Sequence, residues 1–134
     1  PEQPLVDGLV DYLNKKKIIV FGPDKFASQL EGSKSFMKNL CKKNNIPTAN
    51  FGVFNDYNNA SNFIKKNGTP IVVKADGLAA GKGVTVAYSE WDAIKALEEC
   101  YIEEKFSDAG ACVVIESFLC GEEASLFAFQ HVLN

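Results

Sequence analysis

The stretch from Ile71 to Ala87 constrains the fold most, because two short apolar runs flank a loop built almost entirely of small residues. Runs rich in Val and Ile are typical of strands. The loop 77–83 contains three glycines, and so bare a backbone can approach an anion and direct N–H groups at it. Lys74 and Lys82 add positive charge. The stretch predicts a strand–loop–strand unit that holds a phosphate, although a tight hairpin loop would explain the glycines equally well.

The spacing differs from that of a Walker P-loop, which has four residues between its glycines and then Gly-Lys followed by Ser or Thr. Gly77 and Gly81 are separated by three residues, and Gly83 follows Lys82. The residues after the loop predict a strand, so we do not expect the helix N-terminus on which P-loops hold phosphate. Loop amides and lysines would hold the anion instead.

The composition argues against nucleic acid and membrane as partners. The 134 residues carry no Arg and a formal net charge of −3, which is unlike a basic nucleic-acid interface. No apolar run approaches the ~20 residues of a membrane span, and the first residues lack the pattern of a secretory signal peptide. The four cysteines form no Cys-x-x-Cys pair. We therefore expect reduced thiols in a cytoplasmic protein.

Hydrophobic periodicity predicts an α+β fold, with an open antiparallel sheet and helices on one of its faces. The chain is also expected to be a piece of a longer protein, because its first helix–strand unit cannot bury both faces alone. The predicted helices cover 4–15, 24–30, 34–43, 57–66 and 90–105, and the predicted strands cover 18–21, 51–54, 71–74, 84–87, 112–115 and 125–129.

Two further segments carry candidate binding groups. Phe118 and Leu119 form an apolar pair in an otherwise turn-like stretch, against which a flat base could pack. Glu123 could accept hydrogen bonds from two ribose hydroxyls, although a hinge with solvated glutamates is the alternative. Lys34 lies in the first turn of a predicted helix, where the helix dipole disfavours a cation. It is therefore either a solvated side chain or one that reaches an anion.

Three segments together resemble the ATP-grasp ligases, and most closely the phosphoribosylamine–glycine ligase family, also called glycinamide ribonucleotide synthetases. They are Leu-Glu-Gly-Ser-Lys at 30–34, Val-Lys-Ala-Asp-Gly-Leu-Ala-Ala-Gly-Lys-Gly-Val at 73–84, and Phe-Leu-Cys-Gly-Glu-Glu-Ala-Ser at 118–125. The resemblance covers essentially the whole chain, and its loop segment is the most specific of the three.

The resemblance implies the following domain limits. The core would be an ATP-grasp small subdomain over 48–117. Residues 1–23 would be the end of an amino-terminal α/β domain, and 24–47 a helical linker. Residues 118–134 would begin the larger ATP-grasp subdomain, which is truncated here.

The resemblance also implies a ligase that joins glycine to 5-phosphoribosylamine in purine biosynthesis, using ATP and passing through a glycyl phosphate. ATP would be bound with Mg²⁺, or with Mn²⁺. The family's acidic metal ligands lie beyond Asn134, so no metal site and no catalytic residue are expected within this chain. Glycine, 5-phosphoribosylamine and the rest of the parent chain would be its partners, and activity of this piece alone is not expected.

Transferred by motif, Lys34 and Lys74 would bind phosphates and the loop would close over them. Glu116 and the apolar pair that follows it would hold adenine, and Glu123 would hold ribose. A non-catalytic ATP-binding module and another ATP-grasp carboxylate–amine ligase are the alternatives, and the loop argues against the second. The predicted ATP-binding residues are Lys34, Lys74, Gly77, Ala79, Ala80, Gly81, Lys82, Gly83, Val84, Glu116, Phe118, Leu119 and Glu123.

Overall fold

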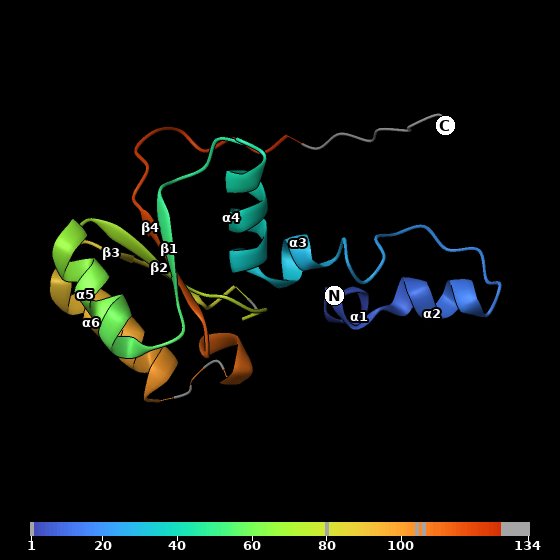
Figure 1. The fold of residues 1–134 in the computed structure, drawn as a ribbon, viewed down its shortest axis with the longest axis horizontal. Coiled ribbons are helices and arrows are strands. Elements are labelled where there is room, and N and C mark those ends of the chain that lie inside the picture. The colour runs from blue at the N-terminus through green and yellow to red at the C-terminus, as the bar shows by residue number, and fades with distance from the viewer. Residues whose placement is uncertain (1, 80, 104, 106, 127–134) are drawn as a thin grey trace.

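A computed structural model describes residues 2–79, 81–103, 105 and 107–126. In these parts of the chain, four strands form one antiparallel sheet in the order β1–β4–β2–β3 (Figure 1). The α+β prediction is confirmed, and four of the predicted strands are present. The strands are β1 Phe51–Phe54, β2 Ile71–Ala75, β3 Val84–Ala87 and β4 Val113–Ser117.

Helices α5 (Tyr57–Asn67) and α6 (Glu90–Tyr101) cover one face of the sheet, as predicted (Figure 1). Successive residues of a strand point to opposite faces, so every second strand residue packs under these helices. The resulting apolar core is fully closed to solvent at its centre. Its main contributors are Ile71, Val73, Ala75, Val113 and Ile115 from the sheet, and Ala60, Ile64, Ala93 and Leu97 from the helices.

Local side-chain chemistry sets the ends of these helices. The Asp56 carboxylate accepts a hydrogen bond from the Asn59 N–H at 2.9 Å and caps α5. Ser89 and Asp92 form a capping box at the start of α6. The predicted end of α6 near residue 105 is wrong, because the Glu98 carbonyl accepts from both the Ile102 and Glu103 N–H groups and closes the helix at Tyr101.

Helices α3 (Gln29–Gly32) and α4 (Lys34–Lys43) lead from the amino-terminal segment to the other face of the sheet. The Ser33 hydroxyl accepts from the Phe36 N–H at 3.1 Å and caps α4. The predicted helix over 24–30 is wrong. The Asp24 carboxylate accepts from the Ala27 N–H at 2.7 Å and caps a set of turns there, and regular helix begins only at Gln29.

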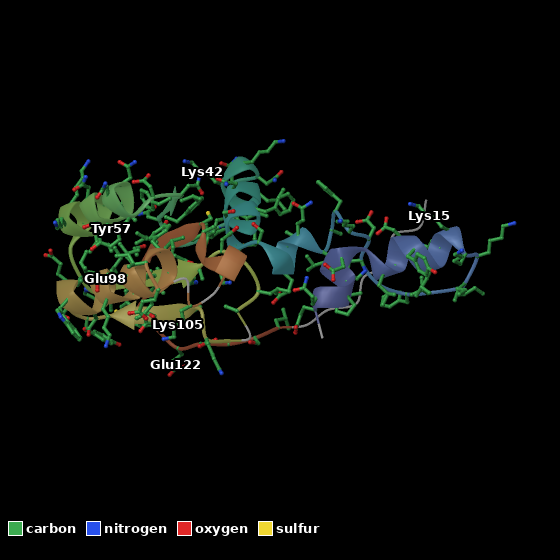
Figure 2. All side chains as sticks on the ribbon, turned by 90° about the horizontal axis from the view of Figure 1, so that it is seen from below. Lys15, Lys42, Tyr57, Glu98, Lys105 and Glu122 are labelled. Carbon is green, nitrogen blue, oxygen red and sulfur yellow. The ribbon has the colours of Figure 1, made fainter. Side chains whose placement is uncertain are left out.

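The amino-terminal segment differs most from the prediction. Gly8 has a φ of 98°, which breaks the predicted helix 4–15 into α1 (Gln3–Asp7) and α2 (Leu9–Lys15). The predicted strand 18–21 is wrong, because the described residues offer it no neighbouring strand. Ile19 and Phe21 are 101% and 93% exposed. Figure 2 shows Lys15, at the end of α2, far from the sheet.

Three smaller points complete the comparison with the sequence. Ser125 and Leu126 belong to no strand, and the rest of the predicted strand, 127–129, lies outside the described residues. Cys41, Cys100, Cys112 and Cys120 are free, as expected, and burial raises the pKa of the Cys100 thiol to about 11. In the described part of the chain, no helix is both long and apolar enough to span a membrane.

Candidate functional site

The face of the sheet turned away from α5 and α6 carries a groove. Lys74 of β2, Glu116 of β4 and Val84 of β3 line it, because each lies out of phase with the strand residues that enter the core. The groove consists of two adjoining pockets of about 650 and 720 Å³. The same three residues line both pockets, so Lys74 and Glu116 lie where the two pockets meet.

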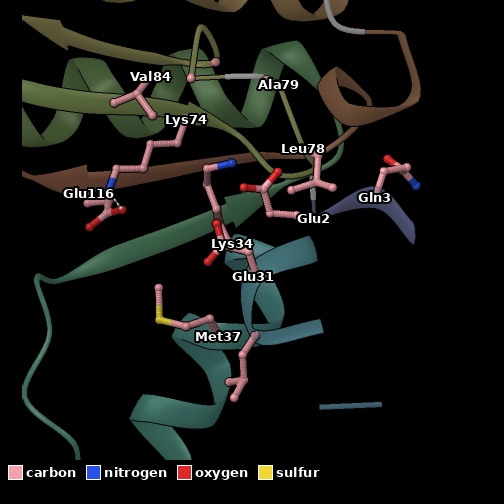
Figure 3. Close-up of a pocket in the computed structure, with 13 residues that line it drawn as sticks. Glu2, Gln3, Glu31, Lys34, Met37, Lys74, Leu78, Ala79, Val84 and Glu116 are labelled. Atoms are coloured by element: carbon pink, nitrogen blue, oxygen red, sulfur yellow. Dashed lines mark ion pairs between the residues drawn. The ribbon is translucent and has the colours of Figure 1, made fainter. Parts of the chain in front are cut away.

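The first pocket lies between the helices α3 and α4 and the glycine-rich loop (Figure 3). Figure 3 shows Lys74 and Glu116 on the sheet side, and Lys34, Glu31 and Met37 on the helix side. Leu78 and Ala79 come from the loop. Four predicted ATP-binding residues from the loop and its end therefore reach this pocket, and they are Ala79, Gly81, Gly83 and Val84.

The second pocket lies between the sheet and the segment after β4. Val72 and Val86 give it an apolar floor, and Phe118, Leu119 and Glu123 also line it. The Phe118 ring packs edge-on against Tyr88, with 5.8 Å between ring centroids. This contact fixes the start of the hinge against the end of β3.

Lys34 is tied to the root of the loop. Its ammonium donates to the Gly77 carbonyl at 2.9 Å and, at 3.4 Å, to the Asp76 carbonyl. Partial burial lowers the pKa of Lys34, and the nearby Lys74 ammonium lowers it further, while the Asp76 carboxylate opposes both effects. Lys34 is therefore not a solvated surface lysine, which excludes one of the two sequence-based interpretations.

Asp76 is a site residue that the sequence did not reveal. Its carboxylate accepts from the Ser33 hydroxyl at 3.0 Å and from the Ser35 N–H, at the N-terminus of α4. An acidic group is favourable at that end of a helix. Its own N–H donates to the Cys112 carbonyl at 2.9 Å. Asp76 thus joins the root of the loop to α4 and to the residue before β4.

A buried charge cluster lies under the point where the pockets meet. The Glu116 carboxylate, whose side chain is 6% exposed, pairs with Lys74 at 2.5 Å through one oxygen and with Lys38 through the other. The Lys38 ammonium also donates to the Thr48 hydroxyl at 2.6 Å. Sequence reasoning missed Lys38, although it lies four residues after Lys34 and so on the same side of α4.

The loop needs glycine for two separate reasons. Gly81 has a φ of 75°, which disfavours any residue with a side chain. A Cβ on Gly83 would lie 2.6 Å from the Ala79 Cβ, because the loop packs back on the end of β2. Two of the predicted ATP-binding residues, Gly77 and Lys82, line neither pocket, and a third, Ala80, lies outside the described residues.

The arrangement suits a nucleotide. An apolar slot for a base opens into a pocket with two lysines and a glycine-rich loop for phosphates. Among the described residues, no group of three or more His, Cys, Asp or Glu side chains could hold a metal ion.

A family model of the ATP-grasp (A) domain of phosphoribosylglycinamide synthetase matches residues 32–132, which include every candidate residue named above. The chain belongs to this ATP-grasp domain family. Among curated relatives, phosphoribosylamine–glycine ligase of Mesorhizobium japonicum is 56% identical over 95% of this chain. The chloroplastic phosphoribosylamine–glycine ligase of Arabidopsis thaliana is 55% identical over 96% of it.

Solved structures of ATP-grasp enzymes share the fold. Phosphoribosylamine–glycine ligase of Thermotoga maritima superposes with a TM-score of 0.71 at 42% identity, over 77% of this chain and 26% of its own. D-alanine–D-alanine ligase of Helicobacter pylori superposes with a TM-score of 0.69 at 29% identity, over 88% and 35%. The ATP-grasp chain described here spans 30% and 24% of the Mesorhizobium and Arabidopsis relatives.

Proposed function

We propose that this chain is the ATP-binding part of a cytoplasmic ligase that joins glycine to 5-phosphoribosylamine and forms glycinamide ribonucleotide in purine biosynthesis. The observation that carries the proposal is the groove, in which an apolar slot and a two-lysine pocket meet at Lys74 and Glu116. The family to which the chain belongs and the names of its relatives support the choice of substrates. The proposed domain limits are those predicted from the sequence.

Within the groove, each part of ATP has a proposed place. Adenine would lie in the second pocket over Val72 and Val86, with Phe118 and Leu119 on its outer side. Ribose would lie beside Glu123. The phosphates would enter the first pocket, where Lys34, Lys74 and the 77–83 loop would bind them.

In the proposed reaction, a glycine carboxylate oxygen attacks the γ-phosphorus, ADP leaves, and the amine of 5-phosphoribosylamine then displaces phosphate from the glycyl phosphate. Phosphoryl transfer depends mainly on positioning and on charge neutralisation. This chain would supply the positioning of ATP and part of the positive charge. Mg²⁺ would neutralise phosphate charge, but the described residues offer no carboxylate cluster that fits it, and we assign no ligand here.

The test is ADP release by the full-length protein, measured in a coupled assay with 5-phosphoribosylamine and glycine. We expect turnover with glycine and little with D-alanine, L-alanine or bicarbonate. ATP binding without turnover on any acceptor would favour a non-catalytic module. Turnover on a different carboxylate would favour another ATP-grasp ligase.

Glycine-rich loop amides should become protected when ATP binds. The loop residues are small and offer few apolar contacts, so the phosphates must supply most of the ordering free energy. Hydrogen exchange followed by mass spectrometry on the peptide containing 77–83 measures this. We expect slower exchange with ATP and no change with adenosine, which lacks the phosphates. Equal exchange in all three conditions would indicate a static turn.

Glu123 should make the protein prefer ATP over 2′-deoxy-ATP. A carboxylate that accepts from both ribose hydroxyls loses one charge-assisted hydrogen bond when one hydroxyl is removed, which costs about 1.5–3 kcal/mol, or roughly 10-fold or more in affinity. Glu123→Ala should remove most of this preference and leave the preference for ATP over GTP unchanged. Comparing kcat/KM for the three nucleotides in both proteins tests it. The control is Glu90→Ala, which removes an exposed glutamate at the start of α6, on the other side of the sheet.

A further inference from the structure

Lys38 is unusual because it is a lysine in the interior that does not reach the groove surface. It is 4% exposed and is the buried residue of α4, and it lines neither pocket. Buried lysines are rare unless they are paired. Its partners are the Glu116 carboxylate and the Thr48 hydroxyl, so it meets Glu116 from the side opposite to Lys74.

The charges of the first pocket show why this position matters. The charged residues that line it are two lysines, Lys34 and Lys74, and three glutamates, Glu2, Glu31 and Glu116. Counted alone, this lining is negative, which opposes the binding of a triphosphate. The positive charge of Lys38 lies directly behind Glu116 and compensates for it.

The ion pairs around Glu116 show in the same way that Lys38 compensates for the Glu116 charge. Glu116 forms ion pairs with both lysines, and the three groups together carry one net positive charge. If Lys38 were neutral, Glu116 would pair with Lys74 alone, and the pair would carry no net charge. Lys74 is the more exposed of the two lysines, with a side chain that is 26% exposed against 5% for Lys38, so the excess charge is presented to the groove at Lys74.

We propose that Lys38 is a positioning residue for nucleotide binding, which neutralises Glu116 from behind, so that the Lys74 ammonium, although paired with Glu116, presents a net positive charge to phosphate. This inference rests on the proposed function, because it assumes that the groove binds ATP. It extends that function by assigning the charge of the phosphate pocket to a residue that does not touch the ligand.

The experiment is titration calorimetry of the full-length protein with ATP and with adenosine. Lys38→Met keeps most of the side-chain volume and removes the charge. We expect it to weaken ATP binding roughly 10- to 100-fold and to change adenosine binding much less. The matched control is Lys42→Met, which removes an exposed lysine one turn along α4, also close to the Phe51 ring. It should bind ATP like the wild type.

A second substitution separates charge from packing. In Lys38→Met/Glu116→Gln, the Glu116 charge and the Lys38 charge behind it are both removed, and Lys74 keeps its positive charge. We expect this double variant to recover most of the ATP affinity lost in Lys38→Met. A purely structural role of Lys38 would give no recovery, because the double variant changes one more buried group.

Three results would overturn the inference: ATP binding by Lys38→Met equal to that of Lys42→Met, an equal loss for adenosine, or a double variant no better than the single one. If Lys38→Met does not fold, the double variant is compared with the wild type, because both clusters carry one net positive charge. ATP affinities within roughly threefold support the inference, and a larger loss contradicts it. Failure of the wild type to bind ATP would instead refute the proposed function.

Discussion

Alanine in place of Lys74 is expected to weaken ATP binding by the full-length protein roughly 10- to 100-fold, the effect of losing a charge-assisted hydrogen bond of about 1.5–3 kcal/mol. Lys74 lies at the end of β2, where the two pockets meet, and the Glu116 carboxylate holds its ammonium in place. A cation fixed in this way loses little conformational entropy when it binds phosphate. Titration calorimetry measures the change directly.

Two further lysines serve as comparisons for Lys74→Ala. Lys82 is exposed on the loop and lines neither pocket, so Lys82→Ala should cause a smaller loss. Lys95 lies on α6, on the other side of the sheet, with its ammonium 5.0 Å from the Trp91 ring centroid. Lys95→Ala should leave ATP binding unchanged. A Lys74→Ala variant that binds ATP as tightly as the wild type would contradict the assignment of the groove.

Alanine in place of Glu116 is expected to lower the free energy of opening of the sheet by about 3–5 kcal/mol, because it leaves a buried charge without its partner. The Lys38 ammonium would keep only the Thr48 hydroxyl among its present polar contacts. Lys74→Ala should cost less stability, because it leaves the Lys38–Glu116 pair intact and removes a side chain that is already 26% exposed.

Native-state hydrogen exchange at the amides of β2 and β4 measures this opening free energy in the full-length protein. Glu122→Ala is the matched control, because Glu122 is exposed, and it should change the opening free energy by no more than about 0.5 kcal/mol. Equal protection in Glu116→Ala and Glu122→Ala would contradict the buried charge cluster.

Features that depend on a few neighbouring residues could be predicted from the sequence. The caps at Ser33, Asp56 and Ser89 each bond to an N–H three residues later, so the signal and its target are adjacent in the chain. The two strands on either side of the glycine-rich loop could also be predicted from neighbouring residues. Both are short apolar runs, and in the structure one face of each strand packs in the core while the other lines the groove.

Features that depend on distant residues could not be predicted. The run 18–21 is apolar enough for a buried strand, but a strand also needs a neighbour, and the run itself carries no information about one. In the site, Lys38 bonds to a residue 78 positions away, and the Asp76 carboxylate accepts from Ser33, 43 positions away. The family resemblance predicted Lys34, Lys74 and Glu116 as binding residues, but the groups that hold them became visible only in the fold.

The alternation along β4 limits how this chain can change in evolution. Ile115 enters the apolar core, while Glu116, the next residue, pairs with two lysines beneath the groove. Inserting or deleting one residue in this strand would exchange the two faces, so that a carboxylate entered the core and an isoleucine faced the lysines. A substitution at Ile115 would disturb the apolar core and one at Glu116 the charge cluster, whereas a change in the length of β4 would disturb both at once.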